Sequence, residues 1–146
     1  MSTKRTIVVK TTDSGLEDSR FEKKAGGTIY PGDICMANAS DEVVVHGTSG
    51  GEPNQLWIAC ENPHLGKTID DAYSSGDMVV LHKIKRGDHL LTRLAASQTI
   101  AFNDLLMSNG DGKVTERTLT NHILGTALEA LTTGGGETGR LLILAR

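Results

Sequence analysis

The first residue pattern in this chain that suggests catalysis is a serine motif. Residues Gly47-Thr48-Ser49-Gly50-Gly51 fit the G-x-S-x-G pattern, in which a sharp turn between a strand and a helix exposes a nucleophilic serine. Residues 42–46 can supply the strand, but Glu52-Pro53-Asn54 does not begin the required helix. The upstream histidine, His46, is almost adjacent to the serine rather than well separated from it. We therefore interpret 47–51 as a glycine loop between strands.

Metal sites find no better support in the spacing of ligand residues. Asn109–Gly112 resembles the centre of a calcium-binding loop, but aligning its last glycine puts Met107 and Thr118 where acidic ligands belong. The five histidines lack the short spacing of a zinc site, and neither Cys35 nor Cys60 lies in a C-x-x-C pair. We predict that the chain is not an enzyme and has no catalytic residue, no metal ligand and no cofactor.

The composition limits the classes of partner. The chain has 146 residues, enough for one domain with a hydrophobic core. A net charge of −3 and 3% aromatic residues argue against a nucleic-acid-binding surface, which is typically basic and carries stacking aromatic side chains. No apolar run approaches the roughly 20 residues of a membrane span, and no signal peptide is evident at the start. We expect a protein made in the cytoplasm that binds neither nucleic acid nor membrane.

Short apolar runs between turn residues predict an all-β fold. Runs of this length, bounded by Gly, Asn, Asp and Pro, are typical of strands in a sandwich or barrel. The predicted strands are residues 28–30, 33–37, 42–46, 56–60, 77–85, 89–94, 105–108, 127–131 and 141–144. Residues 69–74 and 115–128 are the two stretches with helical character, and for the end of the second one we favour a strand. The predicted fold class is a small β-barrel or β-tulip of short strands.

A repeated turn organises the middle of the chain. The pairs Gly32-Asp33, Gly76-Asp77 and Gly87-Asp88, with the variant Asn103-Asp104, each precede an apolar run. Glycine supplies the positive φ that such a turn needs, and the aspartate can accept hydrogen bonds from the backbone amides of the turn. We therefore predict that these aspartates stabilise turns rather than bind metal or act as catalytic acids.

The N-terminal part of the sequence predicts an extended arm. Thr6, Ile7, Val8, Val9 and Lys10 form a β-branched run, and residues 11–27 after it are polar and rich in charge. We predict an arm and polar tether over 1–27 and a β-barrel body over 28–146. The alternative is that 6–10 is an ordinary first strand of the body, followed by a long surface loop.

Several short motifs follow one another in a fixed order over residues 27–146. These are Tyr30-Pro31-Gly32-Asp33, Ile58-Ala59-Cys60-Glu61-Asn62, Gly66-Lys67-Thr68-Ile69-Asp70-Asp71-Ala72-Tyr73, Ser75-Gly76-Asp77-Met78-Val79, Arg86-Gly87-Asp88, Asn103-Asp104-Leu105-Leu106, Ser108-Asn109-Gly110-Asp111-Gly112 and Gly125-Thr126-Ala127-Leu128-Glu129-Ala130. In this order, which covers about four-fifths of the chain, the motifs resemble the family of tailed-bacteriophage head decoration (capsid cement) proteins.

The resemblance implies a structural protein of the virion. It implies a homotrimer on the outside of an icosahedral head, where it binds the major capsid protein and stabilises the shell by bridging neighbouring subunits. Members of the family often use an N-terminal arm for strand addition, which would assign the capsid contact to Thr6, Ile7, Val8, Val9 and Lys10. The alternatives are a small β-barrel hydrolase that uses Ser49 or an unseen metal site, and a generic ligand-binding barrel module.

Overall fold

The structure, a computed structural model, describes residues 6–11, 20–52 and 55–146. Over these residues the fold is all-β, as the sequence predicts, and the only helical element is the short 3-10 turn η1 (Pro63–Leu65). No helix in the described part of the chain is long and apolar enough to cross a membrane. The strands are β1 (Val8–Lys10), β2 (Arg20–Lys24), β3 (Ile34–Ala37), β4 (Val43–Val45), β5 (Trp57–Ala59), β6 (Met78–Lys83), β7 (His89–Leu94), β8 (Thr99–Ile100), β9 (Leu105–Ser108), β10 (Val114–Glu116), β11 (Gly125–Ala127), β12 (Leu131–Thr132) and β13 (Gly139–Ala145).

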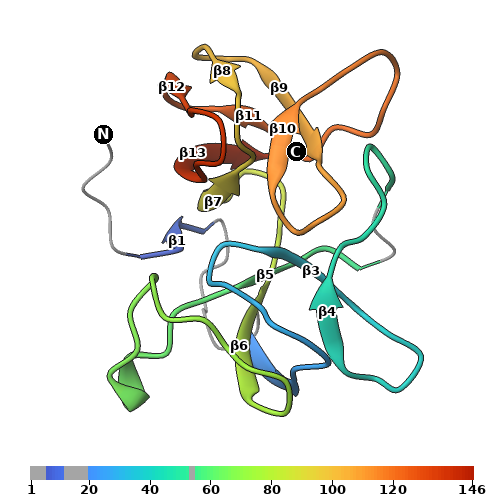
Figure 1. Cartoon of the computed structure of the whole chain (residues 1–146), viewed down its shortest axis with the longest axis vertical. Coiled ribbons are helices and arrows are strands. Elements are labelled where there is room, and N and C mark those ends of the chain that lie inside the picture. The colour runs from blue at the N-terminus through green and yellow to red at the C-terminus, as the bar shows by residue number, and fades with distance from the viewer. Residues whose placement is uncertain (1–5, 12–19, 53–54) are drawn as a thin grey trace.

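Five strands form a closed barrel in the upper half of Figure 1. The order is β7-β10-β9-β11-β13, and β13 closes the ring by pairing with β7. The β7–β13 pairing is the longest in the barrel, and it is antiparallel from Gly139 against Leu94 to Leu144 against His89. The β7–β10 pairing is parallel and has a single register pair, Val114 with Leu94. A barrel this small has no room for a channel, so side chains fill its interior.

The lower half is a second five-stranded sheet, in the order β2-β6-β5-β3-β4. Its two edges curl toward each other, because Ala25, which follows β2, forms a parallel bridge with Val43 of β4. The amide of Gly26 donates to the Val43 carbonyl at 2.8 Å. The sheet therefore wraps around its own core, which contains Ile29, Tyr73, Leu81 and their neighbours.

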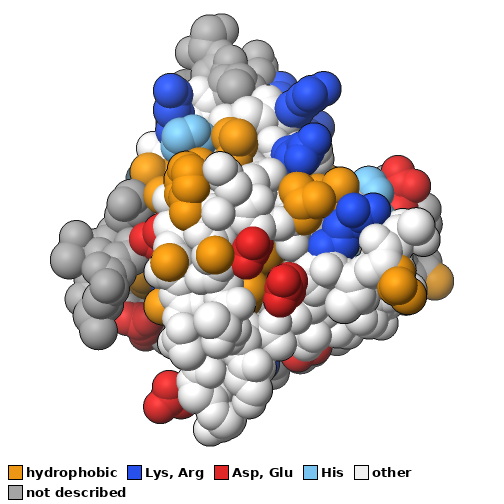
Figure 2. All heavy atoms as spheres, turned by 90° about the horizontal axis from the view of Figure 1, so that it is seen from above, with side chains coloured by type: hydrophobic (Ala, Val, Ile, Leu, Met, Phe, Trp, Pro, Cys, Tyr) orange, Lys and Arg blue, Asp and Glu red, His pale blue; other side chains and the backbone are white. Residues whose placement is uncertain are grey.

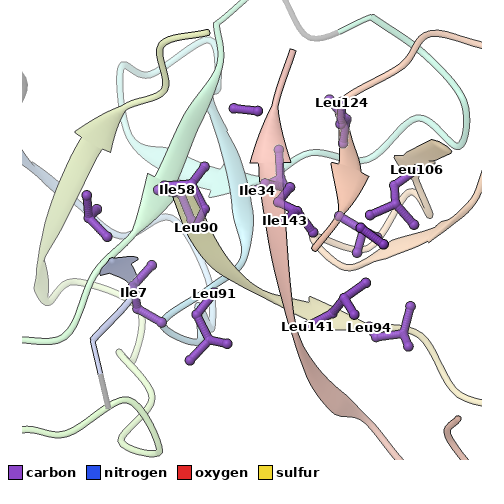
Figure 3. Packing of buried hydrophobic residues seen from close by; sticks show 14 of the residues in the cluster. Ile7, Ile34, Ile58, Leu90, Leu91, Leu94, Leu106, Leu124, Leu141 and Ile143 are labelled. Carbon is purple, nitrogen blue, oxygen red and sulfur yellow. The ribbon is translucent and has the colours of Figure 1, made fainter. Parts of the chain in front are cut away.

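Strands β3 and β5 separate the two cores. In a strand successive side chains point to opposite faces. Ile34 and Ile58 therefore pack into the core of the upper barrel, together with Leu90, while Cys35 and Ala59 pack into the lower core. Figure 3 shows Ile34 and Ile58 among the leucine and isoleucine side chains of the upper barrel. Two apolar faces in one short run explain why β3 and β5 are hydrophobic throughout.

The four turns predicted from the Gly-Asp repeat share one geometry. Gly32, Gly76, Gly87 and Asn103 have φ of 96°, 93°, 96° and 73°. In each turn the aspartate Oδ2 accepts a hydrogen bond from the amide three residues earlier, at 2.8–2.9 Å. The aspartate amide in turn donates to the carbonyl of that same residue, at 3.0–3.1 Å. The predicted role of these aspartates in the turns is confirmed.

Some elements differ from the sequence prediction. Residues 20–24, expected within a polar tether, form β2 and pair with β6 over five register pairs. Their charged residues conceal the strand pattern in the sequence. In the structure Phe21 packs on the lower core, while Glu22 and Lys24 face solvent. The predicted strand 28–30 is reduced to a single bridge between Ile29 and Tyr73. The helical character of 69–74 and 115–128 does not produce a helix.

Replacing Asp33 is expected to destabilise the fold far more than replacing Asp77. Each residue closes a turn of the same type, but Asp33 is buried and also binds Arg93 at 2.8 Å, whereas Asp77 is exposed. Asp33→Asn keeps an acceptor for the turn and leaves the partly buried arginine without its anion, a loss of about 3–5 kcal/mol. Asp77→Asn should change stability by about 0.5 kcal/mol or less. Urea unfolding of the two variants measures the difference, and equal losses would contradict this role of Asp33.

Candidate protein-interaction surface

The segment predicted to bind the capsid lies against the barrel of its own chain. Val8 pairs with Leu90 of β7, and Lys10 pairs with His89 after a shift in register. Ile7 is fully buried in the barrel core, and the Leu91 amide donates to the Ile7 carbonyl at 2.8 Å. Figure 3 shows the Ile7 side chain beside Leu91. In the isolated chain the segment is therefore a strand attached to the body, which is the alternative that the sequence left open.

Two buried carboxylates hold this segment in place. The Ile7 amide donates to Glu61 Oε2 at 3.0 Å, and Thr11 Oγ1 donates to Asp88 Oδ1 at 2.9 Å. Asp88 is the aspartate of a Gly-Asp turn, and its other oxygen accepts from the Lys85 amide and contacts His82 Nε2 at 2.8 Å. Local sequence patterns do not predict these contacts, because Glu61 and Asp88 lie 54 and 77 residues from their partners, which come just before and just after β1.

The strand divides the predicted capsid-binding residues into two groups. Ile7 and Val8 point into the core, while Thr6, Val9 and Lys10 are exposed. Strict alternation would not place two consecutive residues inward and the next two outward, and the pairing with β7 shifts register between Val8 and Lys10. The outward group is the part of the segment that another protein can contact without unfolding the barrel. Its role in capsid binding remains a prediction. Residues 1–5 and 12–19 of the predicted arm and tether lie outside the described residues.

A charged cluster joins the barrel to the lower sheet. Arg93 and Arg140 face each other across β7 and β13, and Arg93 binds Asp33. Arg140 donates to the carbonyls of Pro31 and Ile69. Burial raises the pKa of Asp33, although the Tyr30 amide and Arg93 act in the opposite direction. Burial, together with the neighbouring Arg93, lowers the pKa of Arg140. Desolvation therefore dominates here, and the cluster positions the two halves more than it adds net stability.

The residues considered for a catalytic role, Ser49 and His46, lie in and beside a loop that is hydrogen-bonded to β9. Ser49 is exposed, and the loop around it is fixed to β9 by the Gly50 amide, which donates to the Ser108 carbonyl at 2.8 Å. The buried His46 places Nδ1 2.6 Å from Ser108 Oγ. Burial, and secondarily His122, lowers the pKa of His46. No group of three metal-ligating side chains occurs among the described residues.

The two cysteines are free and buried. Burial raises the pKa of Cys60 to about 12 and that of Cys35 well above its usual range. Both thiols are therefore protonated at neutral pH and act as small apolar side chains.

The surface carries several large apolar side chains that the fold does not cover. On the face of the barrel end seen in Figure 2, hydrophobic side chains lie next to Lys and Arg side chains. Six large hydrophobic residues of the described chain are exposed: Val9, Tyr30, Leu65, Met78, Phe102 and Leu119. Two of them, Leu65 and Met78, line one pocket of about 650 Å³ beside Tyr73. The other four come from separate turns and strands.

Comparison with known proteins finds similarity of fold among solved structures. No family model matches the chain, and no curated protein matches it. Among solved structures, the chain is similar to the one described as the head fiber gp8.5 N base in bacteriophage phi29, with a TM-score of 0.59. The alignment covers 87% of this chain and 92% of that chain at 13% identity. Because the coverage is high in both directions, the likeness concerns the whole fold, including both halves.

Shortening Ile7 should destabilise the protein, whereas shortening Val9 should not. Ile7→Ala removes a fully buried side chain from the barrel core and is expected to cost about 2–5 kcal/mol. Val9→Ala changes a side chain that is 38% exposed on the same strand, and should cost about 0.5 kcal/mol or less. Urea unfolding of both variants tests whether β1 is an integral strand. An unchanged stability of Ile7→Ala would show that the segment leaves the barrel in solution.

Proposed function

We propose that this chain is a structural protein of a phage head. The observation that carries the proposal is the fold similarity to the base of a phage head fiber, which extends over most of both chains. The order of short motifs that resembles head decoration proteins is a property of the sequence and supports the proposal separately from the fold. The exposed apolar side chains on a rigid double barrel suit a protein that works by contact.

The more specific proposal is a capsid cement protein on the outside of the head. Such a protein binds the assembled shell better than the separated subunits, so it stabilises the shell by mass action, by about 2.7 kcal/mol per site at a concentration of 100 times Kd. Bridging of neighbouring subunits of the major capsid protein would follow from more than one contact surface per molecule. The exposed side chains of Thr6, Val9 and Lys10 are the proposed contact on β1.

A second candidate is an anchor for a longer head fiber, and the description of the fold relative as the base of a head fiber favours it. The two candidates differ in what the protein does to the head. A cement protein raises the temperature at which heads come apart, whereas an anchor binds the head without this effect.

The protein is expected to be a homotrimer in solution. Three copies multiply modest single contacts through avidity, which a protein that holds a shell together needs. Size-exclusion chromatography with light scattering at micromolar concentration measures the mass directly. A monomer at this concentration would contradict a homotrimer in solution.

Changing Val9 should weaken binding to heads without weakening the fold. Val9→Glu places a charge on the exposed side of β1, and Met78→Glu places one on an exposed side chain of β6 in the other half. Binding is measured by co-sedimentation with purified heads of the phage that encodes the protein. The Val9→Glu variant should no longer sediment with the heads, whereas the Met78→Glu variant should still do so. Both variants should have the melting temperature of the unmodified protein. Equal binding of Val9→Glu and the unmodified protein would rule out the contact through β1. No binding of the unmodified protein would reject the capsid function.

A further inference from the structure

A pocket lies among β2, β6 and the segment that contains η1. Its volume is about 650 Å³, which is within the range of sites that hold a ligand, roughly 300–1,000 Å³. Leu65 of η1 and Met78 of β6 line it and are 71% and 50% exposed. Ala72 and Tyr73 extend the apolar part of the lining. Leu65 and Met78 are therefore available for apolar contact with a partner.

One buried polar side chain in the lining is not used by the fold. Asn62 is 7% exposed and lines the pocket. It occupies the N-cap position of η1, where an asparagine usually accepts a hydrogen bond from a backbone amide, yet its side chain makes no such bond. Within the described part of the chain its side-chain amide has no hydrogen-bond partner, and neither of its polar atoms is fully enclosed. The amide therefore reaches the surface of the pocket, where a ligand can pair with it.

The charged side chains that line the pocket are mainly acidic. They are Glu22, Asp71 and Asp77, against one lysine, Lys67, and one histidine, His64. Glu22 is exposed and makes no ion pair with the described residues. In each of the two aspartates Oδ2 accepts a hydrogen bond from a backbone amide of the same turn, at 2.7 and 2.8 Å, which leaves Oδ1 available to a partner. The lining therefore favours a cationic group beside the apolar contacts.

We propose that this pocket binds a segment of another protein in which an apolar side chain lies next to a lysine or arginine. The apolar side chain packs on Leu65 and Met78, and the cation pairs with the carboxylates of the lining. The amide of Asn62 presents both donors and an acceptor, which match the C=O and N–H groups of an extended peptide backbone. A nucleic acid fits less well, because the acidic side chains repel its phosphates.

This inference goes beyond the proposed role in a phage head and does not depend on it. The pocket shares no residue with the contact proposed on β1, which consists of Thr6, Val9 and Lys10. The partner in the pocket is therefore a second one, and its binding is measured without heads.

Fluorescence anisotropy with the full-length chain tests the proposal. The probe is a short fluorescein-labelled peptide of alternating Lys and Leu residues, and a peptide of alternating Glu and Leu residues is the second probe. At low salt the Lys-Leu peptide should bind about tenfold more tightly than the Glu-Leu peptide, or better. Raising the salt from about 0.1 M to about 1 M should weaken its binding, because the Debye length falls from about 10 Å to about 3 Å.

Two variants separate the contacts in the pocket. Asn62→Leu replaces the amide by an apolar side chain of similar shape and should weaken binding of the Lys-Leu peptide about tenfold. Its melting temperature should not fall, because the fold makes no hydrogen bond to this amide. Leu65→Ala/Glu22→Gln removes an apolar and a charged contact and should weaken binding at least as much. The matched control Leu119→Ala/Glu116→Gln changes an exposed leucine and an exposed glutamate outside the pocket and should bind as the unmodified chain does.

Four results would each overturn the proposal. The first is absence of Lys-Leu peptide binding at low salt, and the second is equal or tighter binding of the Glu-Leu peptide. The third is a loss of binding in the control variant as large as in Leu65→Ala/Glu22→Gln. The fourth is a lower melting temperature of Asn62→Leu, which would show that the fold itself uses the amide.

Discussion

The arrangement of the two halves depends on buried carboxylates that bind two elements at once. Asp33 uses one oxygen to close its own turn at Tyr30 and the other to bind Arg93 of the upper barrel. Asp88 closes its turn at Lys85 and contacts His82 of the lower sheet and Thr11 after β1. An ionised carboxylate away from water needs most of its acceptor sites occupied, so each of these groups imposes the relative position of several segments. The turns at Asp33 and Asp88 therefore shape the chain locally and also fix how distant segments lie relative to one another.

Strands β3 and β5 supply the apolar part of the junction between the upper barrel and the lower sheet. Their alternating side chains belong to both cores, so the boundary between the halves is a wall of two strands rather than a surface between two domains. Ile34 is also hydrogen-bonded across the boundary, since its amide donates to the carbonyl of Gly112 in the β9–β10 hairpin at 2.8 Å. A shared wall of this kind makes the halves rigid with respect to each other, and a protein that works by contact at several surfaces benefits from that rigidity.

The sequence predicted what depends on local chemistry and missed what depends on distant partners. The Gly-Asp turns and most of the strands follow from residues next to each other, since glycine at positive φ and apolar alternation act within a few positions. The attachment of β1 did not follow, because the amide of Ile7 finds its acceptor on Glu61 and its side chain finds a place in the barrel core. Strand β2 was missed because an edge strand tolerates charges on its solvent face, which makes it look like a loop in the sequence.

The position of β13 in the barrel has a kinetic consequence. This strand lies between β7 and β11 and follows both of them in the chain, so the ring cannot close until its residues have been synthesised. Until then β7 and β11 present open backbone edges and the leucines of the barrel core are uncovered, which is the state in which β proteins aggregate. Closure also joins residues about 50 positions apart, such as Leu91 and Leu142, and such non-local pairing places all-β proteins among the slow folders, at milliseconds to seconds. Slow synthesis or low temperature during expression should therefore affect the soluble yield of this protein more than its final stability.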